Sequence, residues 1–63
     1  MKYSVTYGCL EWQDQNRYSS KNKAYNFYDK IINNPITMGL YTMDFAILED
    51  DGITKDSWQN VPN

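Results

Sequence analysis

The sequence predicts an α+β fold, in which one amphipathic helix packs on one face of a small antiparallel sheet of three to four strands. The prediction rests on two observations. Apolar residues recur at helical spacing in the middle of the chain, and the stretches on either side alternate between apolar and polar residues as strands do. We expect the order strand, optional short strand, helix, strand, strand, in a single domain over residues 1–63.

The first strand is predicted at residues 3–7, where apolar and polar side chains alternate. The alternation changes phase after Gly8, because Leu10 and Trp12 are the next large apolar residues. A β-bulge or bend at residues 8–9 would return these two side chains to the same face of the sheet.

The next segment gives a weaker strand signal. Residues 13–16 are all polar and predict a turn. Arg17 and Tyr18 could then form a brief second strand before the helix, so the sheet is expected to have three or four strands.

The helix is predicted within residues 19–35, and local sequence specifies both of its ends. A serine at position 19 or 20 supplies the N-cap, since its hydroxyl oxygen can accept a hydrogen bond from a free amide of the first turn. Asn33, Asn34 and Pro35 end the helix, because the residue before a proline is pushed out of the α region. The predicted apolar face consists of Ala24, Phe27, Tyr28, Ile31 and Ile32.

A central strand is predicted at residues 38–49, which are rich in aromatic and aliphatic side chains. The buried core is expected to contain Phe27, Ile31 and Phe45, which lie at the centres of the helical and strand patterns. One side of this strand would carry Tyr41, Met43, Phe45 and Ile47, and the other Leu40, Thr42, Asp44, Ala46 and Leu48.

A hairpin turn at residues 50–52 and a returning strand at residues 53–58 complete the predicted sheet. A two-residue loop at Asp51 and Gly52 would place Phe45 opposite Trp58. A four-residue loop would instead place Leu48 opposite Ile53, and the sequence leaves both alternatives open. Residues 61–63 are expected to form a short tail.

The composition limits the chemistry that this chain can carry. It has 63 residues, a formal charge of −2, one cysteine and no histidine. An intramolecular disulfide is therefore excluded, and we expect no metal site and no cofactor. Because Cys9 has no histidine to act as its base and Asp44 has no partner carboxylate at a recognisable spacing, we expect no catalytic residue and no enzyme.

The sequence predicts a soluble protein of the cytoplasm. A lone cysteine suits a reducing compartment, and no secretory signal follows Met1. No stretch approaches the roughly 18–20 apolar residues that span a bilayer, so no membrane association is expected.

Charge is divided unevenly between the two halves of the chain. Residues 1–33 carry five cations and three anions, a balance of +2, whereas residues 34–63 carry one cation and five anions, a balance of −4. Such asymmetry can steer association with a charged partner.

The cations near the start of the helix suggest an alternative function. Arg17, Lys21 and Lys23 are interleaved with Tyr18 and Tyr25, as in sites that bind single-stranded nucleic acid. A small nucleic-acid-binding regulatory protein is therefore the alternative, although the net negative charge and the absence of known binding motifs oppose it.

A short chain rich in Asn, Lys, Ile and Tyr, with Ala24 and Ala46 as its only alanines and no enzyme motif, resembles the small accessory proteins of tailed phages with AT-rich genomes. Proteins of this class commonly bind and disable a host protein. The resemblance implies a non-catalytic phage inhibitor that binds a host protein, such as a component of an anti-phage defence system, in the host cell cytoplasm.

The acidic hairpin and aromatic residues near it are the expected partner-binding residues. An aromatic ring supplies desolvated contact area, and the surrounding charges steer the encounter. The predicted set is Asp50, Asp51, Trp58 and Tyr41. An open sheet edge and more aromatic area than one helix can cover also predict a two-fold homodimer.

Overall fold

The computed structural model describes residues 2–60, which form four strands and one helix. The expected tail at residues 61–63 lies outside this range. The elements are β1 (Tyr3–Gly8), β2 (Gln13–Tyr18), α1 (Lys21–Asn33), β3 (Phe45–Asp50) and β4 (Ile53–Gln59). Their order confirms the predicted α+β fold with one helix and a four-stranded sheet.

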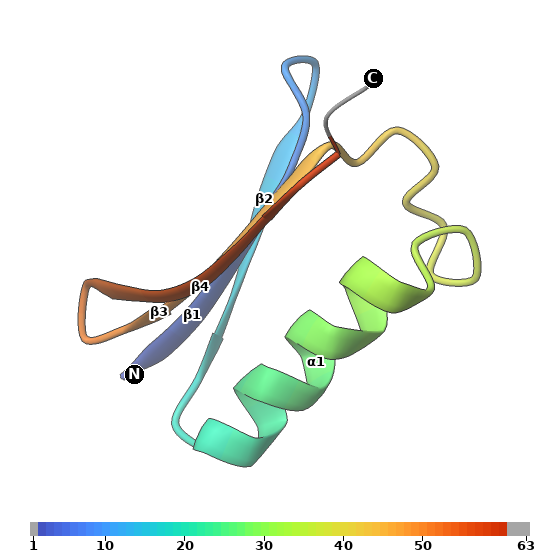
Figure 1. The fold of residues 1–63 in the computed structure, drawn as a ribbon. Coiled ribbons are helices and arrows are strands. Elements are labelled where there is room, and N and C mark those ends of the chain that lie inside the picture. The colour runs from blue at the N-terminus through green and yellow to red at the C-terminus, as the bar shows by residue number, and fades with distance from the viewer. Residues whose placement is uncertain (1, 61–63) are drawn as a thin grey trace.

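The sheet is antiparallel throughout, with the strand order β2-β1-β3-β4. The inner strands are β1 and β3, and the outer strands are β2 and β4. Helix α1 lies on one side of the sheet, where it contacts β1, β2 and β3, and no other element of residues 2–60 covers the opposite side (Figure 1).

Both ends of α1 follow the local signals in the sequence. Ser20 is the N-cap, and its Oγ accepts a hydrogen bond from the backbone N–H of Lys23 at 3.4 Å. At the other end, the N–H of Asn34 donates to the carbonyl oxygen of Lys30 at 2.9 Å, directly before Pro35. The predicted helix and its serine cap are therefore confirmed.

The core lies between α1 and the covered face of the sheet. Ile31 is fully buried, as predicted, whereas Phe27 is half-buried beside Tyr7 and Tyr18 at the flank of the helix. The buried residues that form this cluster are Val5, Tyr7, Ala24, Tyr28, Ile31, Met43, Ala46 and Leu48.

The predicted burial of Phe45 is wrong. In β3 it is Ala46 and Leu48 that are fully buried in the core under α1, so Phe45 and Ile47 point to the uncovered face and are only half-buried. The physical reason is space, because the small side chain of Ala46 lets the helix approach the sheet.

The predicted central strand is also too long. Strand β3 begins at Phe45, and residues 34–44 form a series of turns instead. The backbone N–H of Leu40 donates to the carbonyl oxygen of Pro35 at 2.7 Å, and Gly39 has a φ of +75°, which breaks an extended conformation. Met43 nevertheless reaches the core and is buried.

Strand β2 occupies the residues that were predicted to form a turn. The chain reverses at residues 9–12, where the N–H of Cys9 donates to the carbonyl oxygen of Trp12 at 2.7 Å. Residues 13–18 then pair with β1 in an unbroken antiparallel register. The expected bulge is therefore wrong, and Leu10 is 98% exposed at the tip of the turn rather than returned to the sheet.

The hairpin between β3 and β4 has the two-residue loop, with Asp51 at φ +54° and Gly52 at φ +83°, as a type I′ turn requires. The expected pairing of Phe45 with Trp58 is wrong by one residue. A β-bulge leaves Lys55 unpaired, so Ala46 lies opposite Trp58. The shift places Trp58 on the face covered by α1, where it packs half-buried against the core.

Gly8 is predicted to be intolerant of a side chain. A Cβ atom at this position would lie 2.3 Å from the carbonyl oxygen of Trp12, and the φ of +147° is itself strained for other residues. We expect Gly8→Ala to lower the free energy of unfolding in urea by about 2–4 kcal/mol. Gly39→Ala is the matched control, since its φ is also positive but no atom lies within 4 Å of the new Cβ, and it should cost only about 1 kcal/mol. Equal losses would show that the close approach at Gly8 is not the cause.

The two faces of β3 predict different costs of truncation. Leu48→Ala should lower the free energy of unfolding by about 3 kcal/mol, because Leu48 is fully buried in the core. Phe45→Ala should cost only about 1.5 kcal/mol, because the ring is partly exposed on the open face. Chemical denaturation of both variants measures the difference, and a larger loss for Phe45→Ala would reverse the assignment of the faces.

Candidate interaction surfaces

The uncovered face of the sheet has an apolar centre and a polar surround. Phe45 and Ile47 occupy adjacent positions of the same face in the inner strand β3. Around them lie side chains from all four strands, namely Ser4, Thr6, Gln13, Gln15, Arg17, Glu49, Thr54, Ser57 and Gln59.

Cross-strand hydrogen bonds order the polar part of this face. The side-chain amide of Gln15 donates to Thr6 Oγ1 at 3.0 Å, and Arg17 Nε donates to Gln15 Oε1 at 3.1 Å. These bonds connect β1 to the outer strand β2. The polar residues therefore form a fixed border along one side of the apolar centre.

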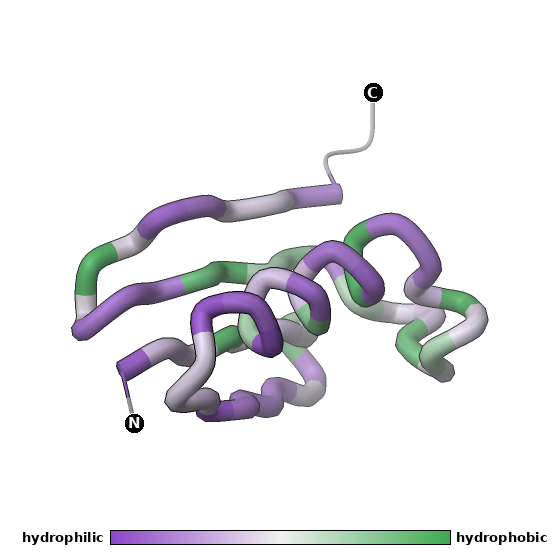
Figure 2. Tube along the Cα trace, turned by 90° about the horizontal axis from the view of Figure 1, so that it is seen from below, coloured by the Kyte–Doolittle hydropathy of each residue, from purple (hydrophilic) through white to green (hydrophobic). Residues whose placement is uncertain are grey.

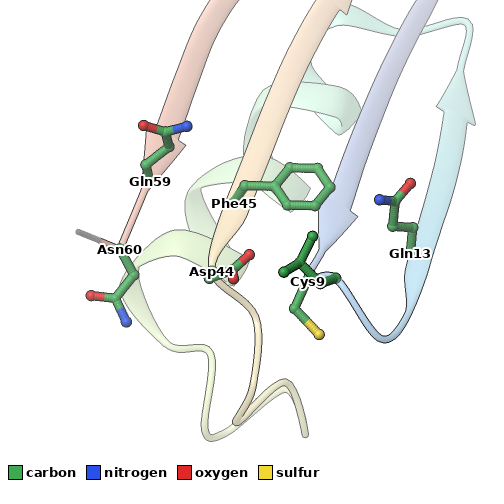
Figure 3. A pocket seen from close by; sticks show the side chains of 7 residues that line it. Cys9, Gln13, Asp44, Phe45, Gln59 and Asn60 are labelled. Atoms are coloured by element: carbon green, nitrogen blue, oxygen red, sulfur yellow. The ribbon is translucent and has the colours of Figure 1, made fainter. Parts of the chain in front are cut away.

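A shallow hollow of about 360 Å³ opens at the end of this face where β1 and β3 meet the loops (Figure 3). The Phe45 side chain extends from β3 toward β1, whose residue at that level is Gly8, so the ring lies over backbone that carries no side chain. The hollow is lined by Cys9, Leu10, Gln13, Asp44, Phe45, Gln59 and Asn60.

A second hollow, of about 340 Å³, adjoins the first along β3 and β4. It is lined by Phe45, Ile47, Thr54, Ser57, Trp58 and Gln59. Phe45 thus forms a wall of both hollows. The shared ring of Phe45 gives both hollows an apolar wall that an apolar side chain could contact.

The structure does not bring the predicted partner-binding residues together. Asp50 and Asp51 flank the hairpin turn, whereas Trp58 lies near the opposite end of β4, about 15 Å along the strand. Asp50 Oδ1 is 3.7 Å from Lys2 Nζ, so its charge is partly compensated. Tyr41 is 75% exposed in the segment between α1 and β3.

The predicted cluster of cations is also divided. Arg17 lies on the uncovered face of β2, where it pairs in register with Ser4. Lys21 and Lys23 lie on opposite flanks of α1, since two residues are 200° apart on a helix. Lys21 is 5.6 Å from the ring of Tyr25, whereas Lys23 lines a groove that faces β2.

The sequence did not predict that Phe45 and Ile47 lie side by side on an open surface. Residues 38–49 are apolar on both faces, so alternation alone could not assign the face that α1 covers. The signal that could have found it is residue size, because the covered side carries the small Ala46.

Burial raises the pKa of Tyr28 to about 12, and the nearby negative charge of Asp56 adds to the effect. Tyr28 is on α1, and Asp56 lies opposite Leu48 on the same covered face of the sheet.

None of the protein-family models, curated proteins or solved structures with which the chain was compared matches it. Within residues 2–60, no three His, Cys, Asp or Glu side chains gather where they could hold a metal ion. In the same range no helix is long and apolar enough to cross a membrane.

Tyr28 predicts a loss of stability at alkaline pH. The folded state keeps the phenol proton up to about pH 12, whereas the unfolded chain releases it near pH 10. The contribution of this proton to the free energy of unfolding is complete below pH 10 and is lost as the pH rises toward 12. The free energy of unfolding of wild type should therefore fall by about 2 kcal/mol more than that of Tyr28→Phe between about pH 9 and pH 11.5. Urea denaturation across this range measures both proteins. Parallel pH profiles would contradict the shift.

Proposed function

We propose that this protein works without catalysis, by binding another protein through the uncovered face of its sheet. We also propose the role that the resemblance of this chain to small phage proteins implies. It is a phage inhibitor of a host protein, such as a component of an anti-phage defence system, and acts in the host cytoplasm. The observation that carries the proposal is the partly exposed pair Phe45 and Ile47 at the centre of a face that no other part of residues 2–60 covers.

The arrangement of apolar and polar residues on this face supports a protein as the partner. Interfaces between proteins have an apolar centre surrounded by polar residues, and aromatic rings in pockets supply most of their binding energy. Phe45 is such a ring, with a hollow on each side of it. Leu10, which is almost fully exposed at the end of the first hollow, extends the apolar area beyond the strands.

The acidic hairpin has a separate role in this proposal. Glu49, Asp50 and Asp51 lie together at one end of β3, and Asp51 is exposed at the turn. Their charge would steer a basic partner during the encounter, while Phe45 and Ile47 supply the contact area. Trp58 borders the second hollow, but its register opposite Ala46 places it on the face covered by α1, so it has no part in this contact area.

The uncovered face could instead bind a second copy of the chain. Two copies packed face to face would bury Phe45 and Ile47 of both and form a two-fold homodimer. Light scattering at high micromolar concentration distinguishes this arrangement from a monomer of 7.5 kDa.

The alternative of a nucleic-acid-binding regulator has less support. A strand of nucleic acid needs cations along one continuous path, beside aromatic rings on which its bases can stack. Arg17, Lys21 and Lys23 point in three different directions instead. A host protein therefore remains the preferred partner.

Replacement of one side chain on the uncovered face tests the proposal. Ile47→Lys places a charge at the centre of the face and should reduce capture of a stoichiometric protein from nuclease-treated bacterial lysate by at least about tenfold. Ile36→Lys is the matched control, because Ile36 is 71% exposed in the segment after α1 and outside the sheet. Circular dichroism and thermal melts would confirm that both variants fold.

Undiminished capture by Ile47→Lys would rule out this face as the binding surface. Loss of all captured material on nuclease treatment would favour the nucleic-acid alternative.

A further inference from the structure

The two edges of the sheet differ in regularity. Strand β2 pairs with β1 over six consecutive residues without a break, and within residues 2–60 it has no other strand beside it. Its outer edge therefore presents a regular row of backbone N–H and C=O groups. Strand β4, at the other edge, is interrupted by the bulge at Lys55. Bulges and lysines are features that protect an edge from pairing, so β2 is the edge open to another strand.

A groove lies between the end of β2, at Tyr18, and one flank of α1. Its volume is about 340 Å³, and it is lined by Tyr18, Lys23, Asn26, Phe27, Lys30 and Met38. The rings of Tyr18 and Phe27, 5.9 Å apart, connect β2 to the helix at its base. Lys30 lies seven positions after Lys23, so the two lysines stand in one row about 10 Å apart along the helix axis.

The charge of this groove is positive and uncompensated. No acidic residue lines it, and within residues 2–60 neither Lys23 nor Lys30 forms a salt bridge. Lys23 and Lys30 are both exposed, so their ammonium groups are accessible to a ligand in the groove. Two unpaired cations above an apolar base favour an anionic occupant that also has apolar groups.

We propose that β2 accepts an extended acidic peptide segment of a partner protein as a fifth strand, with its carboxylates beneath Lys23 and Lys30. Backbone hydrogen bonds to β2 would hold the segment, as in other cases of strand addition. Alternate side chains of a strand are about 6.6 Å apart on one face, so acids at alternate positions would follow the row of lysines. Tyr18, Phe27 and Met38 would contact the aliphatic parts of these side chains.

A peptide fits this edge better than a nucleic acid does. The outer edge of β2 offers alternating donors and acceptors, which match another backbone strand and not a phosphodiester chain. The row of cations consists of Lys23 and Lys30. Arg17 does not continue it, because Arg17 lies on the opposite face of β2. This site uses none of the residues assigned to the uncovered face, so either proposal can fail while the other stands.

A synthetic peptide tests the role of charge. The probe is an eight-residue peptide that alternates Glu and Thr, acetylated and amidated at its ends, and titrated by calorimetry at low salt. Lys23→Glu combined with Lys30→Glu should weaken binding by at least about tenfold. Lys21→Glu combined with Lys55→Glu is the matched control, since it changes the net charge equally but lies outside the groove, and it should change affinity less than about threefold. Equal losses in both double variants, or no binding by wild type, would overturn the proposal.

A second test uses wild-type protein only and so does not depend on the folding of a variant. N-methylation of the peptide at every Glu, or at every Thr, blocks hydrogen bonding along one edge of the peptide strand. Strand addition predicts that one of the two methylated peptides loses binding and the other keeps it. If both bind as the parent peptide does, the β2 edge is not used. Tighter binding of a single-stranded oligothymidylate than of the parent peptide would also overturn the proposal.

Discussion

The packing of α1 on one face of the sheet is the interaction on which the rest of the structure depends. Tyr28 and Ile31 fill the space above the inner strands and are fully buried there. A helix of 13 residues is about 20 Å long and about 10 Å wide, so it covers two strands spaced about 4.8 Å apart but not four. The second face and the outer strands therefore stay accessible. Every candidate surface of this protein includes a part of the sheet that the helix is too narrow to cover.

Local signals in the sequence were enough to predict the elements whose ends they specify. The helix follows from apolar spacing, a serine cap and Pro35, all of which act within one or two turns. The hairpin turn follows from Asp51 and Gly52, since few residues other than glycine, asparagine and aspartate adopt a positive φ readily. The acidic turn of the candidate surface was therefore predictable, and so was the α+β order of the elements.

Features that depend on partners distant in sequence were not predictable. Residues 13–16 form a strand because β1 pairs with them, although their side chains show no apolar alternation. The face of Phe45 was decided by the approach of the helix to Ala46, and the position of Trp58 by a bulge at Lys55 that has no signature in the sequence. Hence the open apolar face and the groove beside β2 became visible only in the folded chain.

The difference between the two edges limits how this sheet can grow. A sheet with two regular edges can accept strands on both sides, and repeated addition then leads to fibres. In this chain the bulge at Lys55 interrupts β4, and Lys55 and Asp56 are charged residues of this strand, which is largely hydrophilic (Figure 2). If a strand joined β2, the other edge of the sheet, β4, could not pair with a further strand in the same way. The proposed addition of a partner strand to β2 would therefore give a closed complex with one segment, because it consumes the one regular edge found within residues 2–60.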